Sequence, residues 1–268
     1  MNKQICNIIL CFLSINFGYG QNNQGARLTA MGNNGAAVKD AGSVEANPAG
    51  IPEITSALLF FNYQKHFFIS GLSAQSFAFL LPIKHSYLAL NLQRYGISEY
   101  HQFKAGLIYT RQFGAKLAIG LRGNYHQLKL TNYGNTIAYS IDLGAIYEIS
   151  EQLCFGIYLN NLSAEQYHTK LPVATLPTIA HLGIAYQAND NFLIATTIKK
   201  ALNEKTEVAV GIDYRFIEAF SLRGGISLRP IRQYFGLGFT AQKILIDFAL
   251  LCNPDLRYLP QITVSYAF

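Results

Sequence analysis

Hydrophobic and polar residues alternate along most of the chain from Thr55 to Phe268. Within residues 116–126, one side carries Leu117, Ile119, Leu121 and Tyr125, and the other carries Lys116, Arg122, Asn124 and His126. The same period of two recurs in residues 137–149, 207–216 and 220–229. Because side chains of a β-strand point alternately to its two faces, the pattern predicts strands with one apolar face and one polar or small face.

The predicted strands are long and numerous. They run for roughly 10–14 residues, about twice the usual length of a strand in a soluble protein. Turn-forming residues divide the chain into about fourteen of them, and an even number is typical of bacterial membrane barrels. Their expected starts are Ser56, Phe67, Ser86, Tyr100, Lys116, Ile137, Gln152, Thr178, Phe192, Thr206, Phe220, Arg232, Ile244 and Tyr258.

The connections between these strands fall into two sets. If the chain enters the barrel from the periplasm, every second connection is expected to be a short periplasmic turn. That set comprises Lys84–His85, Gly114–Ala115, Ser150–Glu151, Asn189–Asp190, Ile217–Glu218 and Gln242–Lys243. The other set contains longer loops, of which Asn161–Pro177 is the longest.

Composition points to a membrane rather than to water. Hydrophobic residues make up 50% of the chain and charged residues 13%, about half the charged fraction of a soluble domain. After the N-terminus we find no apolar run of helix-spanning length, about 18 residues. Without a spanning helix, a closed barrel is the fold that satisfies all backbone hydrogen-bonding groups inside a lipid bilayer. We therefore predict an all-β fold, a transmembrane antiparallel barrel of about fourteen strands in a bacterial outer membrane, facing outer-membrane lipid.

Both ends of the chain carry expected processing signals. Lys3, an apolar stretch from Ile5 to Phe17, and Gly18 and Gly20 predict a signal peptide over residues 1–20. The barrel is expected over residues 55–268. Its last strand ends on Ile262, Val264, Tyr266 and Phe268, which resembles the signal read by the barrel assembly machinery.

Residues 21–54 do not alternate and are rich in Gly, Ala and Asn. Small residues let a backbone run close to a wall, so we predict an N-terminal plug, or hatch, inside the barrel. Its motif consists of Gly25, Ala26, Arg27, Met31, Gly32, Gly35, Asp40, Ser43, Asn47, Pro48, Ala49 and Gly50. The Asn47-Pro48-Ala49 turn is interpreted either as a seat for a fixed plug or as a moving gate.

This motif resembles the N-terminal region of the PorV/PorQ family of Bacteroidetes outer-membrane proteins. The same Asn-Pro-Ala element is similar to the hatch of FadL-type barrels. The first resemblance implies a non-enzymatic accessory factor in type IX protein secretion or surface display, with secreted proteins as clients. The alternative is a FadL-like passive channel for small hydrophobic compounds, and a third interpretation is a purely structural barrel.

Charged residues on the inner faces form a second candidate feature. They are Lys104, Lys116, Arg122, Asp142, Glu148, Glu207, Asp213, Arg215, Arg223, Arg229 and Asp247. We interpret them as ion pairs that fill the lumen and anchor the plug, the alternative being a selectivity lining.

Other chemistry finds little support. The six histidines lack metal-ligand spacing, and no catalytic or nucleotide-binding motif is present. Basic residues are scattered, which argues against nucleic-acid binding. We therefore expect no metal, no cofactor and no enzymatic activity.

Overall fold

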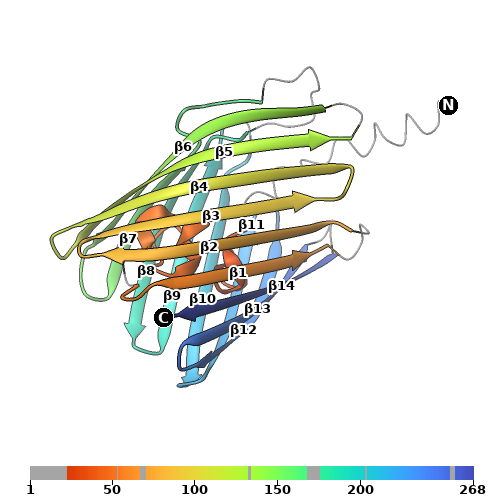
Figure 1. Ribbon diagram of the computed structural model, residues 1–268. Helices are drawn as coiled ribbons and strands as arrows, with labels where there is room; N and C mark the ends of the chain where they lie inside the picture. The colour runs from red at the N-terminus through yellow and green to blue at the C-terminus, as the bar shows by residue number, and fades with distance from the viewer. Residues whose placement is uncertain are drawn as a thin grey trace.

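The computed structural model describes residues 23–52, 54–66, 71–131, 134–167, 176–202, 204–253 and 257–268. The expected signal peptide lies outside these residues. The described chain forms a closed antiparallel barrel in which each strand pairs with its sequence neighbours and β1 pairs with β14 (Figure 1). Its strands are β1 (Leu58–Lys65), β2 (Ser73–Ile83), β3 (Ser86–Gly96), β4 (Tyr100–Phe113), β5 (Leu117–Leu130), β6 (Gly134–Glu148), β7 (Leu153–Asn160), β8 (Ile179–Asn189), β9 (Phe192–Ala201), β10 (Glu207–Ile217), β11 (Phe220–Leu228), β12 (Arg232–Ala241), β13 (Ile244–Asn253) and β14 (Arg257–Ala267).

The predicted all-β barrel of about fourteen strands is confirmed, and most strands begin within two residues of the expected position. Two starts differ. β2 begins at Ser73 rather than Phe67, after a bend at Gly71, and β6 begins three residues early at Gly134. The short connections fall at one end of the barrel, and we call this end periplasmic.

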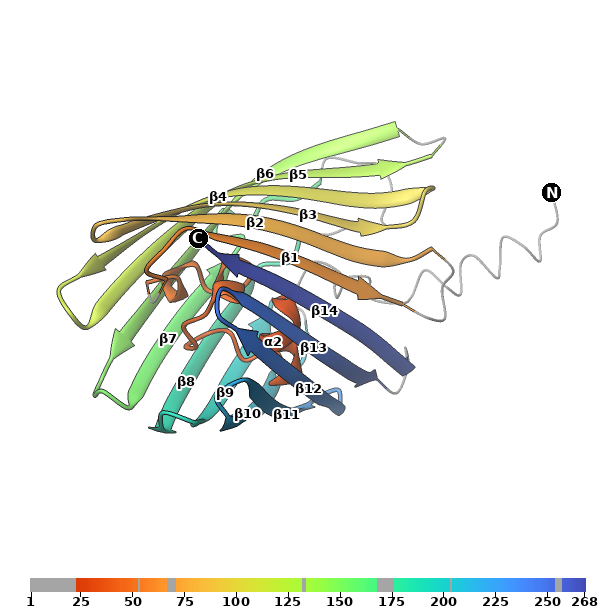
Figure 2. The same cartoon turned by 60° about the horizontal axis from the view of Figure 1, so that its bottom comes forward.

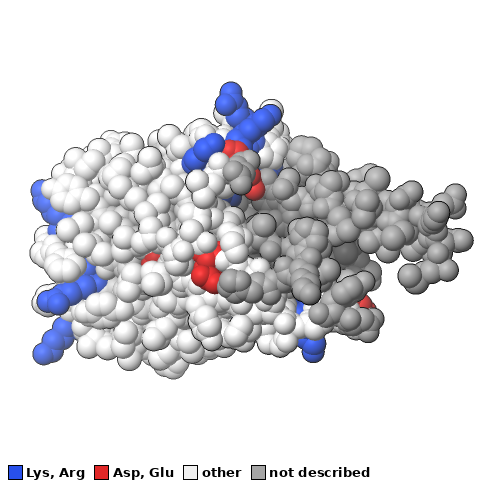
Figure 3. Space-filling view, turned by 90° about the horizontal axis from the view of Figure 1, so that it is seen from above, with Lys and Arg blue, Asp and Glu red and all other residues white. Residues whose placement is uncertain are grey.

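The outer surface of the wall is apolar. On β4, Leu107 and Tyr109 are exposed, whereas Ile108 between them is fully buried. On β5, Leu121 is exposed and the next residue, Arg122, is fully buried. Most of the wall facing the viewer in Figure 3 carries no charge, and the Lys and Arg side chains lie mainly at its left end and along its upper edge. An exposed apolar belt of this extent suits hydrocarbon rather than water. The fold and this belt place the protein in an outer membrane.

Residues 23–52, which we call the inner segment, lie within the barrel (Figure 2). The segment contains a short helix, α2 (Gly25–Ala30), and two 3-10 turns, η2 (Ala41–Val44) and η3 (Pro48–Gly50). α2 lies against β11–β14, and η3 lies against β4, β5 and β6 on the opposite wall. The inner segment therefore crosses the lumen.

Candidate functional site: the inner segment and the lumen

Glycines on the inner face of the wall receive the inner segment. A Cβ added to Gly211 would lie 2.0 Å from the Met31 carbonyl oxygen, and one added to Gly156 would lie 2.0 Å from the Ala36 carbonyl oxygen. The other glycines whose added Cβ would crowd the segment are Gly120, Gly144, Gly183, Gly225 and Gly236. Glycine weakens a strand interior unless another backbone must come close. The wall is therefore shaped to the inner segment.

Asn47 joins the inner segment to the wall. Its side-chain oxygen accepts a hydrogen bond from Ala49 N at 3.0 Å and caps η3. Its amide nitrogen donates to the carbonyl oxygens of Ala36 at 2.6 Å and, on the wall, Ile157 at 3.1 Å. Next to it, Thr110 Oγ1 donates to the Pro48 carbonyl at 2.6 Å. The Asn-Pro-Ala turn is thus hydrogen-bonded to β4 and β7.

Ion pairs hold the periplasmic side of the inner segment. Arg27 pairs with Asp40 within the segment and with Asp213 on β10, where Nε and Oδ2 are 2.8 Å apart. Burial opposes the positive charge of Arg27, but the Asp40 and Asp213 carboxylates outweigh burial and raise its pKa. Lys39 pairs with Glu148 near the end of β6.

A third polar cluster surrounds Arg122 of β5, which is completely buried. Its guanidinium binds Asp142 at 2.7 Å and Tyr158, and it donates to the Val44 carbonyl of the inner segment at 2.6 Å. Glu45 lies beside this cluster and accepts a hydrogen bond from Asn91. Burial raises the pKa of Glu45 to about 7, although positive charges nearby oppose the shift.

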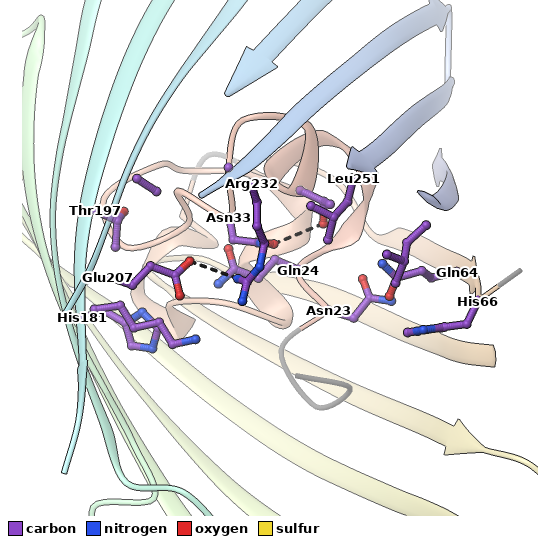
Figure 4. Close-up of a pocket in the computed structure, with 15 residues that line it drawn as sticks. Asn23, Gln24, Asn33, Gln64, His66, His181, Thr197, Glu207, Arg232 and Leu251 are labelled. Carbon is purple, nitrogen blue, oxygen red and sulfur yellow. Dashed lines mark hydrogen bonds and ion pairs between the residues drawn. The ribbon is translucent and has the colours of Figure 1, made fainter. Parts of the chain in front are cut away.

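Two cavities lie on opposite sides of the inner segment. The outer cavity, of about 70 Å³, is lined by residues including Asn23, His181, Thr197, Glu207 and Arg232 (Figure 4). The periplasmic cavity, of about 680 Å³, is lined by charged, polar and apolar residues from the segment and the wall. Among the described residues, the two cavities share no lining residue.

β10 shows what separates the two cavities. Glu207 and Ala209 line the outer cavity, whereas Asp213 and Arg215 line the periplasmic one. Gly211 lies between these pairs and touches Met31. The contact between Met31 and Gly211 is therefore part of the barrier across the lumen.

The wall also has a seam beside β6. β7 is short and pairs with β6 from Leu143 to Glu148, whereas β5 pairs with β6 along its full length. Beyond the β7 pairing, Leu162 N donates to the Ile141 carbonyl at 2.7 Å. Among the described residues, Leu162 rather than a paired strand thus adjoins this edge of β6 at Ile141.

Most of the predicted lumen residues lie inside the barrel. Arg122 pairs with Asp142, Arg223 pairs with both Asp213 and Asp247, and Glu207 pairs with Arg232. Lys104 lines two small cavities, and Glu148 pairs with Lys39 of the inner segment.

Two predicted lumen residues lie at the rims instead, which corrects their assignment. Lys116 is exposed in the β4–β5 turn, and Arg229 is exposed in the β11–β12 turn. Arg215 is exposed near the periplasmic end, where it donates to the Asp190 carbonyl at 2.6 Å, but it still lines the periplasmic cavity as predicted. The alternating pattern in the sequence continues past the part of each strand that encloses the lumen, so it assigned residues of the turns to the lumen as well.

All residues of the predicted plug motif lie within the described inner segment. Gly35 and Gly50 allow close packing within the segment, because a Cβ there would crowd Ala46 and Ser43 respectively. Lys39, Glu45 and Arg232 were not among the predicted site residues: Lys39 and Glu45 lie in the inner segment, which has no alternating pattern, and Arg232 is the first residue of β12. The sequence reasoning also missed the glycine row, although glycines at inward positions of several long strands were a usable signal.

The described residues define the class of protein: a transmembrane β-barrel of the outer-membrane type whose lumen is crossed by an N-terminal segment. In the described part of the chain, no helix is long and apolar enough to span a membrane. No cluster of potential metal ligands occurs there either.

Solved structures with a similar fold include hydrocarbon channels. The chain is similar to a deletion mutant of TodX, a monoaromatic hydrocarbon channel, with 13% identity and a TM-score of 0.72 over 91% of this chain and 99% of that one. It is also similar to the *Pseudomonas putida* toluene transporter TodX, with 12% identity and a TM-score of 0.69 over 92% and 96%. A *Pseudomonas aeruginosa* FadL homologue gives 11% identity and a TM-score of 0.62 over 92% and 98%.

At this level of identity the likeness concerns the fold. No protein-family model and no curated protein matches the sequence. The fold is shared with these neighbours, a FadL homologue among them, and the predicted alternative of a FadL-like channel is taken up as a proposal below. The type IX role and its protein clients stay predictions without support from these comparisons.

Proposed function

We propose that this chain is a passive outer-membrane channel for small hydrophobic compounds, with the inner segment as its plug. The observation that carries the proposal is a plugged barrel with a cavity on each side of the plug. Its fold over nine-tenths of the chain is that of a toluene transporter and a monoaromatic hydrocarbon channel.

Passage through the lumen requires movement at the barrier between the cavities. On β10, the backbone of Met31 packs directly against Gly211 between the two cavities, so this part of the inner segment must shift to let a solute through. The seam beside β6 gives an apolar solute a second way out, sideways into the membrane. Only this lateral route avoids carrying an apolar molecule through the periplasmic cavity.

The test is uptake of toluene into liposomes that contain the purified barrel. We expect faster uptake than into protein-free liposomes of the same lipid. No uptake above that background would refute the proposed function.

A disulfide between the plug and the wall tests the lumen route. A Cβ at Gly32 would lie 3.6 Å from the Ala209 Cβ, close to the usual Cβ separation of a disulfide, about 3.8 Å. We expect the Gly32→Cys/Ala209→Cys variant, with Cys154 and Cys252 changed to Ser, to transport slowly when oxidised. Reduction of the same sample supplies the control and is expected to restore uptake. Equal rates in both states would exclude movement of residue 32 as a step in passage.

A further inference from the structure

The outer cavity contains buried polar atoms that lack a hydrogen-bond partner among the described residues. They are Asn23 Nδ2, His66 Nε2, His181 Nε2 and Thr197 Oγ1. In Figure 4, His181 and Thr197 lie on one side of the cavity, and Asn23 and His66 lie on the other. A buried polar group without a partner is costly, so several of them around one cavity indicate a polar occupant.

The strands place these groups in a row. His181 on β8 is the register partner of Lys199 on β9, which in turn is the register partner of Glu207 on β10. Thr197 is two residues before Lys199 and therefore lies on the same face of β9. The inner face of this part of the wall thus offers hydrogen-bonding groups from three adjacent strands.

Charges of both signs surround the cavity. Arg232 pairs with Glu207 at 3.4 Å. Lys199 is close enough to both Glu207 and Glu204 for their negative charges to act on it. Two cations, Lys199 and Arg232, and one carboxylate, Glu207, thus line the cavity, and the exposed Glu204 outside the lining supplies a second negative charge that acts on Lys199.

Apolar surface completes the lining. Ala209, Leu251 and Leu259 face the same cavity. Its volume of about 70 Å³ is roughly half that of an engineered cavity that holds benzene. The cavity therefore suits one end of a small molecule rather than a whole aromatic ring.

We infer that the outer cavity binds the polar end of a small neutral solute, one that carries a hydroxyl or carbonyl oxygen. This inference rests on the proposed channel function and narrows its substrate class. Asn23 would donate to the oxygen, whereas Thr197 and His181 can each donate or accept. A plain hydrocarbon would leave all of these groups without partners.

The test compares phenol with toluene, which have the same ring and differ in a hydroxyl against a methyl group. Binding to the barrel in lipid nanodiscs is measured by equilibrium dialysis, with protein-free lipid subtracted. We expect phenol to bind about fivefold more tightly than toluene, as one neutral hydrogen bond provides. Equal or tighter binding of toluene would overturn the inference, as would benzoate binding more tightly than phenol.

Thr197→Val removes one hydroxyl at nearly constant volume and is expected to weaken phenol binding about threefold while leaving toluene binding unchanged. Thr240→Val is the matched control, because Thr240 lines the periplasmic cavity, and it is expected to change neither. Asn23→Ala tests the opposite side of the cavity in the same assay. If none of these variants at the outer cavity alters phenol binding, the cavity holds solvent only and the inference fails.

The liposome assay separates this inference from the proposed function. Toluene uptake without any preference for phenol would overturn the inference alone. Absence of uptake for both solutes would overturn the channel function itself.

Discussion

The carbonyl oxygen of Met31 lies 2.0 Å from the position that a Cβ of Gly211 would occupy. The two residues meet in this way because position 211 is glycine. Along β10 this contact falls between the residues of the outer cavity and those of the periplasmic cavity. A missing side chain on the wall thus lets the backbone of the plug close the lumen.

Gly211→Ala is expected to push the plug away from β10. The added methyl group overlaps the backbone of Met31, which cannot swing aside as a flexible side chain would. Overpacking of this kind costs about 1–3 kcal/mol. We expect lower stability in denaturant titrations, faster amide exchange in residues 23–52 and higher conductance in planar bilayers.

Gly123→Ala is the matched control, because Gly123 lies on β5 and has no atom within 4 Å of an added Cβ. It is expected to leave stability, exchange and conductance as in the wild type. Equal effects of the two substitutions would show that the glycine contact does not seat the plug.

We expect the side-chain nitrogen of Asn47 to contribute more to the stability of the plug than its side-chain oxygen does. Asn47→Asp keeps the oxygen that caps η3, but it places a carboxylate against the carbonyl oxygens of Ala36 and Ile157. We expect Asn47→Asp to destabilise the plug by about 2 kcal/mol or more, and by more than Asn47→Ala. Exchange of plug amides measures this order, and exposed Asn135 changed to Asp is the control.

Glu45 makes the stability of the plug inside the barrel depend on pH. Its pKa rises from 4.5 to about 7 on folding, so the folded state holds this proton more firmly than the unfolded state does. The contribution to stability is fully present below about pH 4.5 and is lost as the pH rises through 7. Lys104 of β4 and Arg122 of β5 are the positive charges that limit the loss.

Glu45→Gln isolates this effect, because glutamine keeps the shape of the protonated acid and does not titrate. We expect the difference in unfolding free energy between the variant and the wild type to grow from pH 4.5 to pH 8, in favour of the variant. Other titrating groups cancel in that difference. A difference that is constant with pH would contradict a raised pKa at Glu45.

Much of the barrel could be predicted from the sequence because alternation is a local property. Leu121 and Arg122 face opposite sides of the wall as expected, and the short turns lie at the positions predicted from the sequence. The same rule failed at Lys116 and Arg229, since the end of a strand depends on its neighbours. Alternation carries no information about where the wall stops.

The inner segment could be predicted as a region, but its contacts could not. The pairing of Arg27 with Asp213 joins residues 186 positions apart, and no periodic pattern links a loop to a strand at such a distance. The two cavities are equally non-local, because each is bounded by several strands and by the plug. His181 and Thr197 line one cavity because the strand register places β8, β9 and β10 side by side, and the sequence alone does not show that register.

The C-terminal strand gives a prediction about assembly. Phe268 N donates to the Ala57 carbonyl at 2.9 Å beside the start of β1, and its ring packs edge-on against Tyr266. We expect deletion of Phe268 to lower the amount of barrel recovered from outer-membrane fractions, whereas Phe268→Tyr keeps the aromatic end and assembles normally. Equal recovery of the deletion variant would show that this residue is not part of an assembly signal.

The ion pair between Lys39 and Glu148 is expected to hold the periplasmic side of the plug. Lys39→Glu places two carboxylates together, so we expect the plug to loosen by about 1 kcal/mol, measured by amide exchange of residues 36–42. Glu148→Lys in the same protein restores opposite charges and is expected to recover most of the loss. Glu151→Lys is the control for this rescue, because Glu151 also lines the periplasmic cavity but belongs to the β6–β7 turn. If both lysines rescue equally, the general charge of the cavity rather than the Lys39–Glu148 contact holds the plug. High salt separates the two cases further, since screening weakens a diffuse attraction more than a partly buried pair.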